Sequence, residues 1–240
     1  IGIKKEVSLM KYYCIGIKGT GMSTLACMLY DMGNEVCGYD DAKDYKFTEE
    51  GLKRRGINIF YDGNHELDKD TIVTCSKAFS DDHKEIKRVK ELGLKIVPYN
   101  EVLGSITKKF DTISVCGTHG KTTTTSILRH LLEKTVGCNY FIGDGKGHVD
   151  LKNRLLVIES DEFNRHFLAF HPKVALITCI ELEHTEIYKD IDDMINTFET
   201  FANKASIVVA NGDDENIRRI NFHNKAIFYG KDNNNDYVIK

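Results

Sequence analysis

A glycine-bounded loop between an apolar strand and a threonine-rich helix start constrains the fold of this chain more than any other feature. Residues 117–125 read Gly-Thr-His-Gly-Lys-Thr-Thr-Thr-Thr, directly after the run Thr-Ile-Ser-Val-Cys at 112–116. A strand, a glycine turn and a Lys-Thr pair that opens a helix direct backbone N–H groups toward phosphates. The pattern therefore predicts a strand–loop–helix unit that binds a nucleotide.

The four threonines at 122–125 support this interpretation. Their branched Cβ atoms crowd the preceding helical turn, so they are poor residues for starting a helix over 121–134. A nucleotide phosphate at the helix N-terminus, with Mg²⁺ on the Thr122 hydroxyl, would stabilise that start. The alternative is an ordinary strand-to-helix turn. The predicted nucleotide-binding residues are Gly117, Thr118, Gly120, Lys121, Thr122 and Thr123.

The composition suits a globular protein with a substantial core and argues against two classes of partner. The 240 residues are 41% hydrophobic and 29% charged, with a net charge of -3. This charge gives neither the basic footprint of a nucleic-acid-binding protein nor a polybasic membrane patch. No apolar stretch has the length of a membrane span. Seven scattered cysteines without a CxxC pair predict reduced thiols in a cytoplasmic protein.

Apolar strand-like runs alternate with helix-like segments, which predicts an α/β fold with mainly parallel sheets. The polar step at 107–109 is the candidate boundary between a Rossmann-like domain (1–108) and a phosphate-loop domain (109–240). In the first domain we expect strands at 12–17, 35–39, 58–61, 70–75 and 94–97, and helices at 22–32, 48–55, 82–92 and 100–106. In the second we expect strands near 110–116, 155–159, 174–178 and 206–210, helices at 121–134 and 191–204, and a loop at 232–236.

A second glycine loop follows the first predicted strand. Residues 16–21 read Gly-Ile-Lys-Gly-Thr-Gly, and Asp40 lies near the end of the next strand. Taken loosely, this is a dinucleotide-binding fingerprint. Lys18 occupies the place of the second glycine, where backbone must approach a pyrophosphate, and this argues against NAD. Two interpretations of Lys18 stay open, namely contact with a diphosphate and a side chain that points to solvent.

The short loop at 117–125, with only Thr118 and His119 between its glycines, resembles the ATP loop of the Mur ligase family. Thr118-His119 is similar in particular to the branch that joins L-alanine to UDP-N-acetylmuramate. Residues 15–23 resemble the UDP-binding loop of that branch, in which glycine is usual at the position of Lys18.

The resemblance implies a UDP-sugar site on the first glycine loop. Asp40 would receive a ribose or uridine hydroxyl, and Ser76 would line the path of the UDP-sugar; the alternative is that both are turn residues. The residues implied in substrate binding are Gly16, Lys18, Gly19, Thr20, Gly21, Met22, Ser23, Asp40 and Ser76.

An acidic strand end at 159–162 resembles the metal-binding segment of the same family. Mg²⁺ is a hard cation that prefers oxygen ligands, and ligands bind at the carboxyl ends of strands in open α/β sheets. Glu159 falls at the family's Mg²⁺-binding glutamate, with Asp161 and Glu162 as second choices. The alternative is a solvated acidic strand end.

The segment 177–184 resembles a second metal-binding stretch. His184 matches the histidine that helps to bind a second metal, while Cys179 and Glu183 stand where the family has Asn and Asp. His119 would face the substrate carboxylate. The residues implied in catalysis are thus Lys121, His119 and His184, and the metal ligands are Thr122, Glu159 and His184.

The resemblance implies an ATP-dependent, Mg²⁺-using ligase of peptidoglycan precursor synthesis. ATP would convert the carboxylate of UDP-N-acetylmuramate to an acyl phosphate, and the amino group of L-alanine would attack it. Three alternatives are a muropeptide ligase of cell-wall recycling, an NAD-dependent dehydrogenase and a non-catalytic nucleotide-sugar-binding protein. Because nothing here corresponds to the family's C-terminal ligase domain, we expect an inactive fragment. The sequence predicts no oligomeric state.

Overall fold

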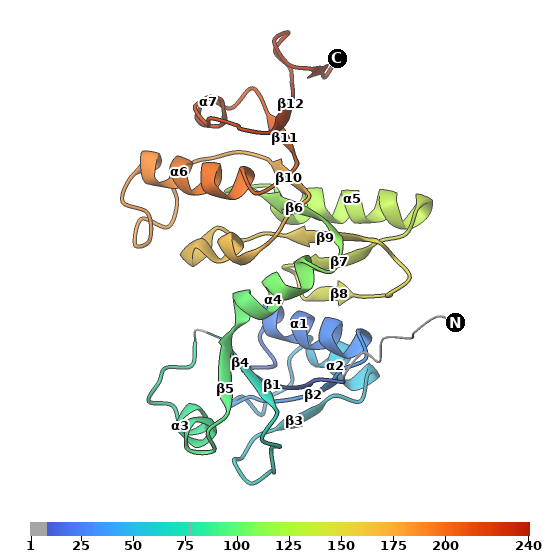
Figure 1. The fold of residues 1–240 in the computed structure, drawn as a ribbon, viewed down its shortest axis with the longest axis vertical. Coiled ribbons are helices and arrows are strands. Elements are labelled where there is room, and N and C mark those ends of the chain that lie inside the picture. Colours follow the sequence, from blue (N-terminus) through green and yellow to red (C-terminus); the bar gives the residue numbers. More distant parts are fainter. Residues whose placement is uncertain (1–8, 77) are drawn as a thin grey trace, which may run out of the picture. The chain divides into compact units, whose positions relative to one another are not determined.

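The computed structural model describes residues 9–76 and 78–240, and the chain divides into two compact units (Figure 1). Unit 1 extends to Val102 and includes Gly147–Asp150, and unit 2 comprises Leu103–Lys146 and Leu151–Lys240. The first division falls inside helix α4 (Tyr99–Thr107), slightly before the polar step at 107–109 that we expected to separate two domains.

Unit 1 is built on a five-stranded parallel sheet in the order β3-β2-β1-β4-β5. The strand order reverses on the two sides of β1, so the carboxyl end of β1 is where a sheet of this kind binds its ligand. The strands are β1 (Lys11–Ile15), β2 (Glu35–Tyr39), β3 (Asn58–Phe60), β4 (Ile72–Cys75) and β5 (Lys95–Pro98).

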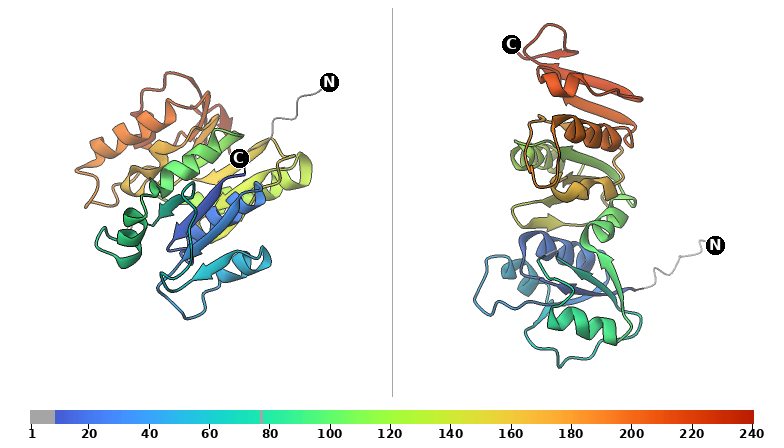
Figure 2. Two further views of the ribbon diagram at one scale, coloured as in Figure 1. Left: turned by 60° about the horizontal axis from the view of Figure 1, so that its bottom comes forward. Right: turned by 90° about the vertical axis from the view of Figure 1, so that its left-hand side faces the viewer.

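Helices cover both faces of this sheet. Helices α1 (Thr20–Asp31) and α2 (Glu49–Arg54) lie on one face, and α3 (Lys84–Glu91) lies on the other (Figures 1 and 2). The core on the α3 side joins Tyr13 and Ile15 of β1 to Ile86 and Val89 of α3. This burial on both faces explains why β1 is a nearly continuous apolar run rather than an alternating one.

Unit 2 is organised around strand β6, which runs parallel to both of its neighbours, β9 and β10. The full strand order of the sheet is β13-β12-β11-β10-β6-β9-β7-β8. The strands are β6 (Asp111–Cys116), β7 (Asn139–Ile142), β8 (Lys146–His148), β9 (Leu155–Glu159), β10 (Val174–Ile177), β11 (Ile207–Asn211), β12 (Lys225–Gly230) and β13 (Tyr237–Val238).

Two long helices and two short ones accompany this sheet. They are α5 (Lys121–Thr135), the 3-10 helix η1 (Phe163–Ala169), α6 (Ile191–Ala202) and α7 (Glu215–Arg218). The fully buried ring of Phe167 contacts Phe198 and Phe201 of α6, with ring centroids 5.2 and 4.5 Å apart. These aromatic contacts attach η1, the turn that follows β9, firmly to α6.

The predicted α/β fold with parallel sheets is confirmed, and every predicted strand and helix has a counterpart. The sequence patterns missed short elements, because segments of two to seven residues carry too little periodicity to be recognised. The missed elements are β7, β8, η1, α7, β12 and β13. No helix in the described ranges is long and apolar enough to cross a membrane. The seven cysteines, all within those ranges, are free of disulfide bonds.

Candidate nucleotide and metal site

The loop between β6 and α5 has a conformation that requires its two glycines. Gly117 has φ +131° and Gly120 has φ +80°, values that L side chains rarely adopt. A Cβ atom at Gly117 would lie 2.1 Å from the Thr178 hydroxyl. Gly120 is the N-cap of α5 and offers no side chain to cap it, so the first N–H groups of this helix lack an intrahelical partner and can receive an anion.

The residues after β10 hold this loop in place. The Thr118 amide donates to the Cys179 carbonyl at 3.0 Å, and the Thr178 hydroxyl donates to the His119 carbonyl at 2.6 Å. The His119 amide also points to the Cys179 sulfur at 3.3 Å. Cys179, one of the two departures from the family pattern, therefore contacts the phosphate loop directly.

Lys121 forms a buried ion pair with Glu162. Its ammonium lies 3.0 Å from Glu162 Oε1 and 2.9 Å from Oε2, and it donates to the carbonyls of Gly117 and Thr118. Glu162 is completely buried, and this burial raises the pKa of its carboxyl while the Lys121 ammonium opposes the rise. One lysine thus leaves the Glu162 carboxylate short of compensating positive charge.

Thr122 and Glu159 come together beside the same loop. The Thr122 hydroxyl donates to Glu159 Oε1 at 2.8 Å, and the Gly143 amide donates to Glu159 Oε2 at 2.8 Å. The structure therefore brings together two of the predicted metal ligands, a hydroxyl and a carboxylate, at the start of α5. This oxygen pair is of the kind that Mg²⁺ prefers.

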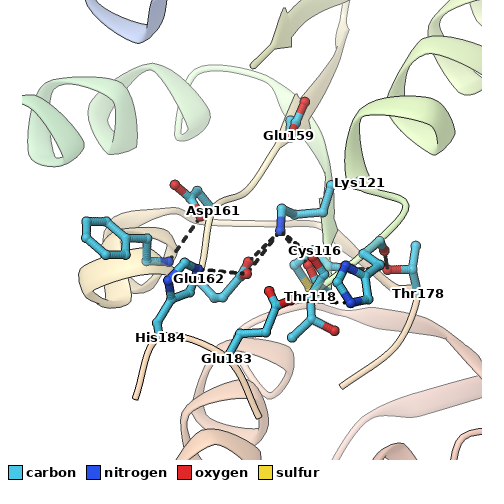
Figure 3. A network of polar contacts seen from close by, with 12 residues as sticks. Cys116, Thr118, Lys121, Glu159, Asp161, Glu162, Thr178, Glu183 and His184 are labelled. Atoms are coloured by element: carbon cyan, nitrogen blue, oxygen red, sulfur yellow. Dashed lines mark hydrogen bonds and ion pairs between the residues drawn. The ribbon is translucent and has the colours of Figure 1, made fainter. Parts of the chain in front are cut away.

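His184 lies with Glu162 and Glu183, whereas Glu159 lies away from it (Figure 3). Ligand atoms of Glu162, Glu183 and His184 all fall within 4.8 Å of one another. His184 adopts φ +53°, and its ring meets the edge of Phe163 at a centroid distance of 4.9 Å. Two carboxylates and an imidazole are ligand types that bind a divalent cation. A cation there would add positive charge beside the buried Glu162 carboxylate.

Two further predicted site residues, Asp161 and His119, have other neighbours. Asp161 accepts the Phe163 amide at 3.1 Å, which is a turn contact. The His119 Nε2 atom lies 3.3 Å from Glu183 and 3.5 Å from Glu181. His119 therefore lies beside carboxylates of this chain, and its predicted role toward a substrate carboxylate remains a prediction.

The first glycine loop closes the carboxyl end of β1. Gly16 has φ +79°, and a Cβ atom there would lie 2.6 Å from the Phe79 ring. Gly19 is the N-cap of α1 and provides no side-chain cap, whereas α3, α6 and α7 are capped by His83, Asp190 and Asp214. The two helices that begin at glycine loops are thus uncapped at the ends where an anion would bind.

The other predicted UDP-sugar residues lie around this loop. Thr20 begins α1, and its carbonyl accepts the Ser23 hydroxyl at 3.0 Å. Met22 and Ser23 are buried on the inner side of the helix. Ser76 follows β4, where its amide donates to the Ile15 carbonyl at 3.2 Å.

The Lys18 side chain does not point to solvent, which was one of the two interpretations that the sequence left open, and its contact with a diphosphate stays a prediction. This side chain is fully buried, and its ammonium contacts Glu49 Oε1 at 2.7 Å and the carbonyls of Ala42 and Asp44 at 2.6 and 2.7 Å. The Asp40 carboxylate accepts the amides of Lys18 and Ala42 at 2.9 and 3.0 Å. No sequence signal pointed to Glu49 as a partner, because the two residues meet only through the fold.

Two α/β units, each with a glycine loop at the carboxyl end of a central parallel strand, form an architecture that is typical of nucleotide-binding proteins. The chain belongs to the Mur ligase family. The protein-family model described as "Mur ligase family, catalytic domain" matches residues 11–111 of the sequence, and the family model described as "Mur ligase middle domain" matches residues 115–240.

Relatives and solved structures agree with this assignment. The UDP-N-acetylmuramate–L-alanine ligase of Lactiplantibacillus plantarum is 39% identical over 94% of this chain and 52% of its own length. The enzyme of the same name from Lacticaseibacillus paracasei is 41% identical over 95% of this chain and 52% of its own length. The structure of UDP-N-acetylmuramate-alanine ligase MurC from Thermotoga maritima matches with a TM-score of 0.79 and 28% identity, covering 92% of this chain and 52% of that one. The chain spans about half the length of the curated relatives it matches.

Proposed function

We propose that this chain carries the UDP-sugar-binding and ATP-binding units of a cytoplasmic UDP-N-acetylmuramate–L-alanine ligase. The observation that carries the proposal is the arrangement at the second glycine loop, where Lys121 and Thr122 meet Glu162 and Glu159 at the uncapped start of α5. The names of relatives about 40% identical supply the substrates, UDP-N-acetylmuramate and L-alanine.

The reaction class follows from the chemistry of the substrates. A carboxylate oxygen is a poor leaving group, so an amine cannot displace it directly. Transfer of the γ-phosphoryl group of ATP to the carboxylate forms an acyl phosphate and ADP. The amino group of L-alanine then attacks the acyl carbon, the bond to the phosphate oxygen breaks, and an amide and inorganic phosphate result.

Each residue of the site has a role in this scheme. Lys121 would exchange its contact with the loop carbonyls for the β- and γ-phosphates of ATP. Thr122 and Glu159 would hold one Mg²⁺, and His184 with Glu162 would hold a second. Bound Mg²⁺ would neutralise charge that develops on the phosphoryl oxygens. Glu183 lies close enough to join the second set of ligands.

Two alternatives have less support. A muropeptide ligase shares this fold, since the ligase for L-alanyl-gamma-D-glutamyl-meso-diaminopimelate from Neisseria meningitides matches with a TM-score of 0.78, but at 22% identity that match shows the fold alone. An NAD-dependent dehydrogenase needs close approach of the backbone to a pyrophosphate at the second glycine of its fingerprint. Here that position is occupied by Lys18.

We predict that UDP-N-acetylmuramate raises the melting temperature of the protein and that NADH does not. A ligand that binds only the native state stabilises it by about 2.7 kcal/mol at 100 times its dissociation constant. Thermal unfolding scans with each ligand provide the measurement. Stabilisation by NADH alone would reject the proposed function.

We further predict that Gly19→Ala weakens UDP-N-acetylmuramate binding at least tenfold. The backbone of Gly19, at φ -65° and ψ 144°, suits any residue, and the new Cβ atom would meet only the Gly16 carbonyl at 3.3 Å. The added methyl group would stand at the uncapped start of α1, where a diphosphate must approach. Gly51→Ala, in α2, is the matched control and should bind like the wild type in calorimetric titrations.

A further inference from the structure

Lys18 is the centre of a buried polar cluster in unit 1. We call the four residues Lys18, Asp40, Thr48 and Glu49 the Lys18 cluster. All four are buried, with exposed fractions of 1, 5, 6 and 4% respectively. The amide, the carbonyl and the ammonium of Lys18 each contact the segment from Asp40 to Glu49, which connects β2 to α2. The ammonium also lies 5.3 Å from the centroid of the Tyr61 ring.

The backbone of Lys18 contributes two of these contacts. Its amide donates to Asp40 Oδ2 at 2.9 Å, and its carbonyl accepts the Thr48 hydroxyl at 2.7 Å. The ammonium adds the Glu49 carboxylate and the carbonyls of Ala42 and Asp44. Lys18 is thus bonded to the beginning, the middle and the end of the connecting segment.

Apolar burial does not explain how this segment is held. Its two large aromatic residues, Tyr45 and Phe47, are 61 and 62% exposed. A segment with so little buried apolar surface depends on its polar contacts for a fixed position. Lys18 and Glu49 hold the segment through Ala42, Asp44, Lys46 and Thr48, with Glu49 Oε1 accepting the Lys46 amide at 3.0 Å. Asp41 has separate contacts with the Tyr39 hydroxyl and with His83 Nε2, and the Tyr45 hydroxyl donates to Glu50.

We infer that Lys18 is a positioning residue, which fixes the segment 41–48 beside the first glycine loop and leaves diphosphate recognition to the backbone N–H groups at the start of α1. The segment leaves the carboxyl end of β2, next to β1, and such ends form the walls of ligand crevices in open α/β sheets. As far as it concerns a UDP-sugar, this inference rests on the proposed function.

A comparison of Lys18→Met with Glu49→Gln separates positioning from direct phosphate contact. If the Lys18 ammonium bound the diphosphate, K18M would weaken UDP binding and E49Q, which removes a negative charge nearby, would leave it unchanged or strengthen it. If the cluster positions the segment, both variants weaken UDP binding. We expect a loss of about tenfold in each, and no greater loss in the double variant, because the two side chains act as a unit.

Hydrogen exchange tests the structural half of the inference without any ligand. The amides of Ala42 and Lys46 donate to Asp40 and Glu49, so they report on the segment. We expect both to exchange at least tenfold faster in K18M and in E49Q. The matched control is Lys53→Met, since Lys53 also contacts Glu49, at 2.9 Å, but is 63% exposed; its exchange should be that of the wild type.

The outcomes distinguish the two proposals. Unchanged exchange at Ala42 and Lys46 in both variants would overturn the positioning role, as would E49Q with wild-type UDP affinity beside a weakened K18M. Absence of UDP binding in the wild-type protein would count against the proposed function instead, and exchange would still decide the role of Lys18. If K18M does not fold, Lys18→Arg and E49Q supply the same measurements.

Discussion

Lys121→Met is expected to reduce ATP affinity by about 100-fold or more, the equivalent of about 3 kcal/mol. The substitution keeps the length of the side chain and removes the only charge that the loop at 117–125 can direct at the phosphates. Calorimetric titration with ATP, in the presence and in the absence of Mg²⁺, gives the measurement. The loss should occur in both conditions, because the ammonium acts on the phosphates themselves.

Loss of folding would also reduce ATP binding, and a second substitution at Glu162 controls for it. Lys121→Met leaves the completely buried Glu162 carboxylate without its partner, which costs about 3–5 kcal/mol of folding free energy. Adding Glu162→Gln neutralises that carboxylate and should restore most of the stability in denaturant unfolding. ATP binding should remain lost in the double variant. Wild-type ATP affinity in a folded double variant would reject Lys121 as the phosphate-binding residue.

The glycine loops illustrate what local sequence could predict about this protein. Both follow apolar strands and open helices, and the positive φ angles of Gly16, Gly117 and Gly120 explain why glycine stands there. Strand–loop–helix units of this kind depend on neighbouring residues, so their pattern is visible along the chain. The outer strands β12 and β13 pair with the strands that precede them in the chain, and a strand of two residues such as β13 is too short to show a period.

The contacts between side chains inside the site were harder to predict, because turns of the chain bring these residues together and their spacing along the sequence does not reveal it. Glu159 ends β9 and is the obvious ligand by position, yet Glu162 is the carboxylate that reaches Lys121 and His184. The chain turns back after Glu162 through Asn164 and Arg165, which have φ +52° and +56°. Left-handed residues other than glycine are uncommon, so the sequence carries little sign of such a turn. Lys18 and Glu49 are a second example, since their contact exists only in the folded unit.

Glu162→Gln is expected to remove one of two Mn²⁺ ions bound in the presence of ATP, with Mn²⁺ standing in for Mg²⁺. His184→Ala should remove the same ion, because the two side chains contribute to one ligand cluster. Glu159→Gln should remove the other ion, because Glu159 contacts Thr122. A carboxamide keeps the shape of a carboxylate but has no negative charge for a hard cation. We expect the affinity for the affected ion to fall at least tenfold in each variant.

Electron paramagnetic resonance titration of free Mn²⁺ counts the bound ions directly and needs no turnover. Glu181→Gln is the matched control, since the Glu181 side chain is 65% exposed and contacts only His119 among the charged groups of the site; it should bind two ions like the wild type. The double variant that combines Glu162→Gln with His184→Ala should lose the same single ion and keep the other one. If that double variant loses both ions, Glu159 and Glu162 share a single site. If Glu162→Gln and His184→Ala each retain two ions at wild-type affinity, the cluster of Glu162, Glu183 and His184 is a structural contact around Lys121 and holds no metal.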